Sequence, residues 1–297
     1  MLELDPVFEE HRTGLSQLAY RMLGSLSDSD DVLQEAYLRW SRQDRAEVRS
    51  PRAYLTSVVT RLCIDQRRAI EARKETYVGP WLPEPVVEQR EPSASERAEV
   101  AESISLAFLV ALEALTPLER AAYLLRQSFD FEYEEIAAIL DKSSDNCRQL
   151  VSRAQSHLRA RRPRFEARPD EAERITTAFL DACATGELDR LVSLLAADAV
   201  LYSDGAGKVL AALAPIRGAD HVGRFFLGVL KKSPPGLQYR RVRVNGRPGV
   251  IATLGAQVVN VLTFDVIDGR IATCFIIRNP DKLPRSDPGL SDSAERN

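Results

Sequence analysis

The chain has 297 residues, of which 44% are hydrophobic and 28% charged, and its formal net charge is -3. This length favours about two domains, and the apolar content excludes a chain that is disordered throughout. No segment approaches the roughly 18 consecutive apolar residues of a membrane span, and the N-terminus has no basic, apolar leader. We therefore expect a cytoplasmic protein with no membrane partner. The widely spaced cysteines (Cys63, Cys147, Cys183 and Cys274) predict neither a metal site nor a cofactor.

Basic residues are concentrated in two blocks. Residues 39–74 contain ten Lys or Arg against four acids, and residues 142–164 contain seven against Asp145 alone. Between the blocks, residues 75–119 contain nine glutamates and two arginines. Basic blocks on helices are typical of proteins that bind the phosphate backbone of nucleic acids, although solvated helix faces can have the same composition.

The first 75 residues are predicted to form an all-α domain. Apolar side chains recur at helical spacing, as in Leu15, Leu18 and Met22. Ser27–Asp30 is expected to supply an N-cap and first-turn acids, and Ser50–Pro51 is expected to start the following helix.

Residues 76–100 are predicted to form an extended, acidic linker. Prolines lack a backbone donor and restrict the preceding residue, so we expect neither a helix nor a strand ladder here. Trp81 and Leu82 are apolar, and a solvated tether would leave both exposed. We expect this part of the linker to dock on another part of the chain, the alternative being a stray exposed aromatic.

Residues 101–163 are predicted to form a second all-α domain with a helix-turn-helix. Two short helices, Tyr133–Leu140 and Asp145–Leu158, are separated by a short break at Asp141–Ser143, and the second has one apolar and one polar face. Because the turn contains no glycine, a generic helical hairpin remains open.

Residues 170–283 are predicted to form an independent α+β domain, followed by a disordered tail over 284–297. Two helices are expected first, one ended by Gly186 and one over 188–195. Strands follow, and Asn245–Gly246 and Asp268–Gly269 are typical hairpin turns.

The N-terminal 162 residues resemble an extracytoplasmic-function sigma factor of bacterial RNA polymerase. The segments Tyr20–Gly24, Asp30–Trp40 and Pro51–Arg68 resemble sigma region 2, whereas Leu115–Arg120 and Glu135–Arg153 resemble region 4. The resemblance implies two partners, core RNA polymerase and promoter DNA with its -10 and -35 elements. It implies polymerase binding by Asp30, Asp31, Gln34, Glu35 and Trp40. It implies DNA binding by Arg61, Arg67, Arg68, Asn146, Arg148, Gln149, Ser152 and Arg153, with phosphate contacts also from Arg73, Arg159 and Arg162.

Three further segments resemble the subgroup with a fused SnoaL-like domain. They are Trp81–Pro85, Asp204–Lys208 and Asn279–Leu283. In that subgroup the extension replaces a separate anti-sigma protein and tunes polymerase binding in cis. The resemblance implies a regulatory interdomain contact through Trp81, Leu82, Pro83, Asp204, Gly205, Lys208, Asn279 and Asp281. The family loop has three consecutive glycines, so Ala206 is a departure that adds a methyl group.

Two alternatives remain. SnoaL-like folds include cyclases and isomerases, for which Asp204, His221 and Lys208 are candidates with Tyr202 lining a cone-shaped pocket, and such a pocket could bind an unknown small ligand. The chain has no nucleophile motif and no paired carboxylates, which argues against an enzyme. A helix-turn-helix repressor that acts without polymerase is the other alternative, but it would not need the Asp30–Trp40 segment.

Overall fold

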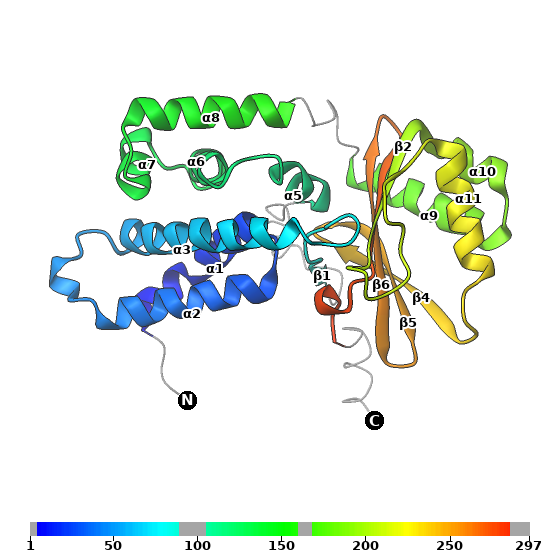
Figure 1. The fold of residues 1–297 in the computed structure, drawn as a ribbon, viewed down its shortest axis with the longest axis horizontal. Helices are drawn as coiled ribbons and strands as arrows, with labels where there is room; N and C mark the ends of the chain where they lie inside the picture. The colour runs from blue at the N-terminus through cyan, green and yellow to red at the C-terminus, as the bar shows by residue number, and fades with distance from the viewer. Residues whose placement is uncertain (1–4, 89–104, 160–167, 286–297) are drawn as a thin grey trace. The chain divides into compact units, whose positions relative to one another are not determined.

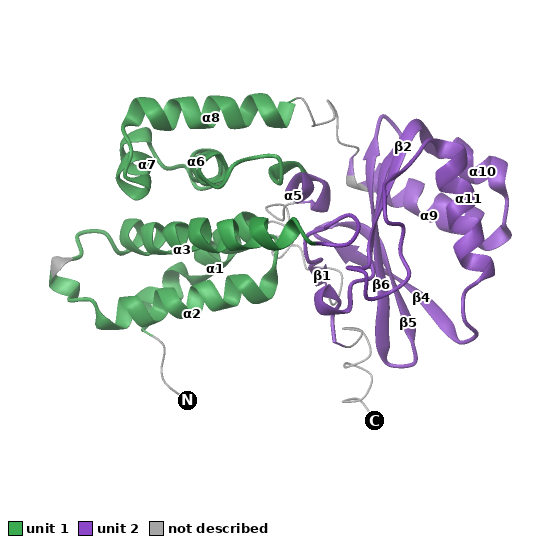
Figure 2. Ribbon diagram, viewed as in Figure 1, with its two compact units in different colours: residues 1–76, 111–162 green, residues 77–110, 163–297 purple. Residues whose placement is uncertain are grey.

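The computed structural model describes residues 5–88, 105–159 and 168–285. The chain divides into two compact units (Figures 1 and 2). We call residues 1–76 and 111–162 the helical unit, and residues 77–110 and 163–297 the sheet unit. The predicted linker therefore divides, because its described residues from Tyr77 onward belong to the sheet unit. Its remainder over 89–100 and the predicted tail from 286 lie outside the described residues.

The first part of the helical unit consists of three helices, α1 (Pro6–Leu23), α2 (Leu26–Arg42) and α3 (Pro51–Lys74), with a short 3-10 turn η1 (Arg45–Glu47) before α3. Ser50 caps α3 as predicted, since its hydroxyl accepts a hydrogen bond from the N–H of Ala53. The predicted cap of α2 is wrong by two residues: Ser25, not Ser27, caps that helix and accepts from the N–H of Asp28.

The second part of the helical unit contains the predicted helix-turn-helix. Helix α5 (Leu106–Leu112) crosses the boundary between the units, and α6 (Pro117–Ser128), α7 (Tyr133–Leu140) and α8 (Ser144–Arg159) follow. Asp141 ends α7 in the left-handed conformation, with φ 54°. Aspartate tolerates this conformation better than most residues, so Asp141 makes the turn that glycine usually makes.

The sheet unit contains a seven-stranded sheet in the order β1-β4-β5-β6-β7-β2-β3. Its elements in chain order are β1 (Val87–Glu88), α9 (Pro169–Thr185), α10 (Leu188–Ser193), β2 (Leu195–Asp204), β3 (Ile216–Arg217), α11 (Ala219–Lys231), β4 (Leu237–Val244), β5 (Arg247–Leu254), β6 (Gln257–Ile267), β7 (Arg270–Ile277) and η2 (Pro280–Lys282). Both predicted hairpins are confirmed: β4 pairs with β5 across Asn245–Gly246, and β6 with β7 across Asp268–Gly269.

The three helices α9, α10 and α11 lie on one side of this sheet (Figure 1). The core between them and the sheet includes Phe179 of α9, Phe226 of α11 and Phe264 of β6, whose rings meet edge to face. On β2, Ala199 and Leu201 belong to this core. Because side chains alternate along a strand, Asp204 faces the opposite side of the sheet from Leu201.

Three elements differ from the sequence expectation. Strand β2 and helix α11 were not predicted, the latter because it contains two glycines, which weaken a helical pattern. Gly223 is needed for close packing, since a Cβ there would lie 3.0 Å from side-chain atoms of Leu188 and Leu191. The linker also forms a ladder after its last proline, because Val87 and Glu88 pair with Val244 and Arg243 of β4.

Among the described residues, no helix is both long and apolar enough to cross a membrane.

Candidate functional site

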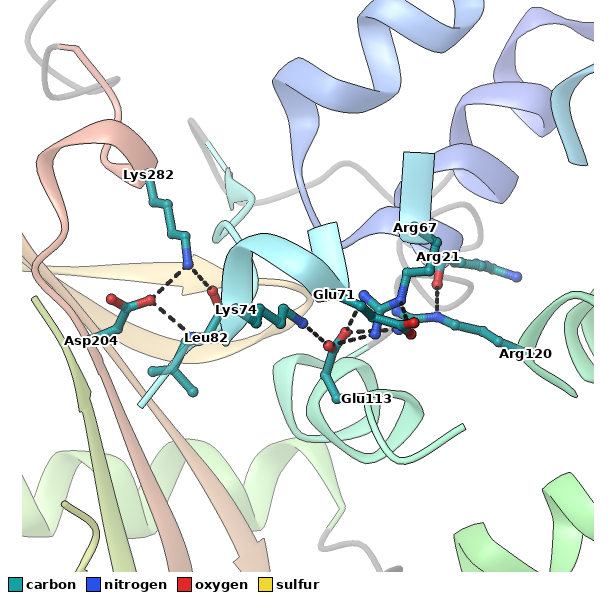
Figure 3. Close-up of polar contacts among 9 residues, drawn as sticks. All are labelled: Arg21, Arg67, Glu71, Lys74, Leu82, Glu113, Arg120, Asp204 and Lys282. Atoms are coloured by element: carbon teal, nitrogen blue, oxygen red, sulfur yellow. Dashed lines mark hydrogen bonds and ion pairs between the residues drawn. The ribbon is translucent and has the colours of Figure 1, made fainter. Parts of the chain in front are cut away.

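A buried carboxylate at the end of β2 binds the linker. Asp204 is fully buried, and its Oδ1 accepts a hydrogen bond of 2.5 Å from the hydroxyl of Tyr77. Its Oδ2 accepts one of 2.9 Å from the backbone N–H of Leu82 and lies 2.8 Å from Nζ of Lys282 (Figure 3). Burial of an unpaired carboxylate costs on the order of several kcal/mol. The linker and Lys282 together therefore make a charged Asp204 tolerable inside the protein.

Lys282 lies in η2 and binds the same linker segment a second time. Its ammonium donates a hydrogen bond of 2.6 Å to the carbonyl oxygen of Leu82. Nζ also lies 4.2 Å from the ring centroid of Trp81 and 5.1 Å from that of Tyr77, within the range of cation–π attraction. One cation thus joins Asp204 to both aromatic residues of the linker.

The tyrosine is held from two sides. Nδ2 of Asn279 donates a hydrogen bond of 3.0 Å to the hydroxyl oxygen of Tyr77, which itself donates to Asp204. Burial, together with the neighbouring carboxylate, raises the pKa of Tyr77 well above its ordinary value. Tyr77 therefore remains a neutral donor to Asp204 at any physiological pH.

The loop after Asp204 has a backbone that restricts every position from 205 to 207. A Cβ on Gly205 would lie 2.6 Å from Cβ of Ala211, and one on Gly207 would lie 3.1 Å from Cβ of Val78. Ala206 between them has φ 54°, in the left-handed region that costs a non-glycine residue about 1–2 kcal/mol. Lys208 closes the loop through an ion pair with Asp281.

The end of the described linker is anchored to the sheet by backbone and side chain together. The N–H of Val86 donates to Oδ1 of Asn245 at 3.1 Å, and the N–H of Asn245 donates to the carbonyl of Val86 at 2.9 Å. Oε1 of Glu88 accepts a hydrogen bond of 2.8 Å from the N–H of Gly246. The turn between β4 and β5 therefore binds the linker as well as reversing the chain.

The structure brings the predicted regulatory residues together. Leu82 and Pro83 are buried and Trp81 is half-buried, and all three belong to the same compact unit as Asp204, Gly205, Lys208, Asn279 and Asp281. Three contributors were missed by sequence reasoning: Tyr77, Lys282 and Asn245. Lys282 lies inside the Asn279–Leu283 motif, so the sequence could have identified it. Asn245 lies in a pattern that predicts only a hairpin turn.

The residues predicted to read the -35 element lie on the exposed side of α8. They are Asn146, Arg148, Gln149, Ser152 and Arg153. Arg148 is paired with Asp145 at 3.0 Å and with Glu134 at 3.5 Å, and its guanidinium lies 5.0 Å from the ring centroid of Tyr133. Ion pairs between exposed side chains contribute about 0–1 kcal/mol, so these partners do not prevent Arg148 from binding elsewhere.

The predicted polymerase-binding residues differ in burial. Asp30, Asp31 and Gln34 are exposed on α2, and Glu35 pairs with Arg39 at 2.8 Å. Trp40 is only 1% exposed and belongs to the core of the helical unit. In this structure Trp40 therefore has a packing role and is not available at the surface.

The predicted -10 arginines on α3 are also in different environments. Arg68 is exposed and pairs with Asp65 at 3.3 Å, whereas Arg67 is 1% exposed and binds Glu113. Nε of Arg61 donates to the carbonyl oxygen of Ile139 at 3.2 Å. Arg73 and Arg159 are exposed, and Arg162 lies outside the described residues.

The candidate catalytic residues do not converge. His221 is exposed on α11, where Nδ1 lies 3.0 Å from the carbonyl oxygen of Arg217. Tyr202 stacks on Phe275, and Asp204 is covered by the linker. Within the described ranges, no three His, Cys, Asp or Glu residues are grouped so that they could hold a metal ion.

Comparison with known proteins identifies both helical regions. Residues 7–73 match the family model of Sigma-70 region 2, and residues 105–158 match that of Sigma-70, region 4. The chain is 38% identical over 293 residues to the ECF RNA polymerase sigma factor SigJ of Mycobacterium tuberculosis, which covers 94% of this chain and 93% of SigJ.

Two other matches extend over nearly the whole chain. The probable ECF RNA polymerase sigma factor SigI of the same organism is 29% identical over 95% of this chain and 97% of its own. The crystal structure of M. tuberculosis SigJ matches with a TM-score of 0.77 at 35% identity, over 94% of this chain and 98% of SigJ. The similarity therefore includes the sheet unit as well as the two helical regions.

Proposed function

Because this chain belongs to the extracytoplasmic-function family of RNA polymerase sigma factors, we propose that its sheet unit regulates the sigma activity in cis by binding the linker between regions 2 and 4. As a sigma factor, the protein binds core RNA polymerase and promoter DNA and starts transcription. The linker joins the two regions that contact DNA. A domain that fixes the linker therefore controls how far those regions can separate.

The observation that carries this proposal is the capture of the linker by Asp204. Its carboxylate binds Tyr77 and Leu82, which precede it by 127 and 122 residues. Full burial of a leucine side chain contributes about 1.5–3 kcal/mol before ordering costs. Contacts of this size are sufficient to hold a short segment, and a larger competing interface can reverse them.

The DNA and polymerase contacts follow from the exposed residues of the helical unit. We assign base reading at the -35 element to the polar face of α8, with Arg148 and Gln149 near its N-terminal end. We assign polymerase binding to the exposed acids and Gln34 of α2. Arg68, Arg73 and Arg159 supply phosphate contacts, which position the protein without reading sequence.

The sheet unit is proposed to act without catalysis. Asp204, the acid on which an isomerase-like mechanism would depend, is occupied by two linker donors and Lys282. No observation among the described residues favours a small ligand over the linker as the group that Asp204 binds. A protein that works with bacterial RNA polymerase on promoter DNA acts in the cytoplasm.

The proposal is tested with the full-length Asp204→Asn variant and core polymerase. The amide retains the shape of the carboxylate but loses its charge, which weakens the hydrogen bonds from Tyr77 and Leu82 and the ion pair with Lys282. We expect faster hydrogen exchange over residues 77–88 and tighter binding to core polymerase, measured by fluorescence anisotropy of the labelled protein.

Asp198→Asn is the matched control, because Asp198 lies on the same strand and is exposed. It should leave both measurements unchanged. Faster exchange in Asp204→Asn together with unaltered polymerase binding would show that linker capture has no regulatory effect, and the proposal would be wrong.

A further inference from the structure

Three arginines on α3 donate hydrogen bonds to the region 4 part of the helical unit. Nη2 of Arg52 donates to the carbonyl oxygen of Phe129 at 2.8 Å, and Nε of Arg61 donates to that of Ile139 at 3.2 Å. Arg67 binds the carboxylate of Glu113 in bidentate fashion, at 3.0 and 2.7 Å. All three acceptors belong to the same compact unit as α3, so these contacts are internal to one body.

Glu113 is the centre of this contact. Besides Arg67, its carboxylate accepts a hydrogen bond of 2.7 Å from Nη1 of Arg120 and one from Nζ of Lys74 (Figure 3). Nε of Arg120 donates to the backbone carbonyl of Arg21 in α1 at 2.9 Å. One acid of region 4 therefore holds two cations of α3, and a cation of α6 reaches back to α1.

The electrostatics of the cluster depend on this one acid. Burial alone raises the pKa of Glu113, but Arg120, Arg67 and Lys74 outweigh that effect and hold it well below its ordinary value. Burial lowers the pKa of Lys74 to about 8 and that of Arg120 to about 10, against the attraction of Glu113. Without the carboxylate, three cations would face one another in a poorly solvated place.

Even with Glu113 present, the positive charge and the buried hydrogen-bond donors of the cluster are not fully compensated. Three cations surround the carboxylate of Glu113, and Oε1 of Glu71 lies 3.6 Å from Nε of Arg67. That Nε and Nη2 of Arg120 are buried and have no hydrogen-bond partner in the described part of the chain. Buried donors without partners cost about 1–3 kcal/mol each. The buried donors therefore weaken the contact between α3 and region 4. Loss of the Glu113 charge should release this contact.

The contact is incompatible with binding both promoter elements. The -10 and -35 elements are about 25 base pairs apart, which corresponds to roughly 85 Å at about 3.4 Å per base pair. In this unit the C-terminal end of α7 is bonded directly to α3 through Ile139 and Arg61. A sigma factor in this form cannot reach both elements, so regions 2 and 4 must separate before the promoter is bound.

From these observations we infer that region 4 occupies the -10 DNA-binding face of region 2, and that Glu113 is the residue that keeps it there. Two acceptors of region 4 take the places of DNA phosphates: the carbonyl oxygen of Ile139 binds Arg61 and the carboxylate of Glu113 binds Arg67, so that neither arginine is free for the nucleic acid. The inference rests on the proposed sigma function and on the assignment of Arg61 and Arg67 to DNA that the resemblance to sigma region 2 implies. Linker capture by Asp204 is a separate contact, so either one can fail without the other.

The test uses the full-length protein with Glu113→Gln, which retains the shape of the side chain and removes its charge. A pair of fluorophores on encoded non-natural residues at the exposed Ser41 and Ser156 reports the separation of α2 and α8 by energy transfer. Binding is measured by anisotropy with a fluorescein-labelled, 20-nucleotide single strand of mixed sequence over a series of salt concentrations.

Glu113→Gln should lower the energy transfer and bind the single strand more tightly than wild type. Two additional phosphate contacts, from Arg61 and Arg67, steepen the slope of log affinity against log salt by about 1.4, because each contact on a single strand contributes about 0.7. Glu75→Gln is the control. It removes the same charge from an exposed position at the end of α3, and should change neither the energy transfer nor the salt slope.

Two results would overturn the inference. Unchanged energy transfer in a folded Glu113→Gln protein would mean that Glu113 does not hold region 4. Lower energy transfer with an unchanged salt slope would mean that region 4 does not cover a DNA-binding face. Should circular dichroism show that Glu113→Gln does not fold, Glu113→Asp is measured in its place. It retains the charge but is one methylene too short to bind all three cations, so the same two shifts are expected at smaller size.

Discussion

Ala206 is a single residue whose conformation is unfavourable for its type. Its φ of 54° lies in the left-handed region, between two glycines that cannot accept a side chain without displacing Ala211 or Val78. The loop orients Lys208 towards Asp281 and follows directly on Asp204. Backbone strain at Ala206 therefore lowers the stability of the segment that contains Asp204 and binds the linker.

Ala206→Gly should stabilise the sheet unit by up to about 1.6 kcal/mol. Removing the left-handed penalty raises the free energy of unfolding by about 1–2 kcal/mol. The greater freedom of glycine in the unfolded chain lowers it by about 0.4–1 kcal/mol. Hydrogen exchange of the β2 amides at equilibrium measures the change. Gly207→Ala is the opposite case, with φ 70° and Val78 close by, and should accelerate the same exchange. Faster exchange in Ala206→Gly would contradict the strain argument.

Arg148 is a residue at which promoter specificity can be tested. Its partners Asp145 and Glu134 have 90% and 70% exposed side chains, so exchanging them for a base costs little. Arg148→Ala should lose about 1–3 kcal/mol at one -35 position and relax the preference there. Arg159→Ala should weaken binding to all sequences alike and reduce the salt slope. Selection from a randomised -35 library in the presence of core polymerase measures both, and an unchanged base preference in Arg148→Ala would refute the assignment.

At the scale of elements, the linker segment 77–88 behaves as part of the sheet unit. It supplies strand β1, the Tyr77 hydroxyl and the buried Leu82 side chain, and it is bound by η2, by the β4–β5 turn and by the end of β2. None of these contacts is local in sequence. A linker with three prolines between 80 and 85 is already stiff, so less entropy is lost when it binds.

The docked linker should be released at alkaline pH. The pKa of Tyr77 is raised in the docked form, whereas free tyrosine ionises near pH 10. For an acid whose pKa is higher in the folded form, the stabilising contribution is complete below about pH 10 and is lost as the pH rises beyond it. Fluorine NMR of protein that contains 5-fluorotryptophan should show the Trp81 resonance shifting above pH 10. Loss of a resonance in Trp81→Phe assigns the signal. A Tyr77→Phe protein should lack the transition, and its persistence there would assign it to another group.

At the scale of the whole molecule, we propose that two sets of contacts restrain the two DNA-binding regions. The helical unit joins α3 to region 4 through Glu113, and the sheet unit holds the linker through Asp204. Each set depends on one carboxylate that binds distant parts of the sequence: the half-buried Glu113 binds Arg67 and Lys74, and the buried Asp204 binds Lys282. Both sets of contacts therefore form only when the tertiary structure forms. Removal of one charge should weaken either set.

Truncation after Arg168 should raise the affinity for core polymerase several-fold, because the linker loses Asp204, Asn279 and Lys282 together. Full-length and truncated proteins are compared by anisotropy with core polymerase and by run-off transcription on a selected promoter. Full-length Asp204→Asn should change core affinity in the same direction. Tighter core binding with loss of transcription would mean that the sheet unit also contributes to the active complex. Unchanged binding and transcription would leave it without a regulatory role.

Local chemistry of the sequence was sufficient for much of the fold. Ser50–Pro51 and Thr116–Pro117 start helices because capping and the fixed φ of proline act within a few residues, and Asn245–Gly246 reverses the chain for the same kind of reason. The need of Trp81 and Leu82 for burial was also evident, as was membership of the sigma family from ordered motifs.

Only the tertiary structure decided which groups these residues meet. In this structure Arg67, which resemblance assigns to DNA, is bound to Glu113, 46 residues away, and Trp40, which resemblance assigns to polymerase, lies in the core. Asp204 could be placed in a motif, but its partners Tyr77 and Lys282 are 127 and 78 residues distant. A charged side chain has the same local pattern whether it faces water, DNA or a buried partner. Its role is set by the desolvation and pairing that folding imposes, and these depend on contacts that no local pattern encodes.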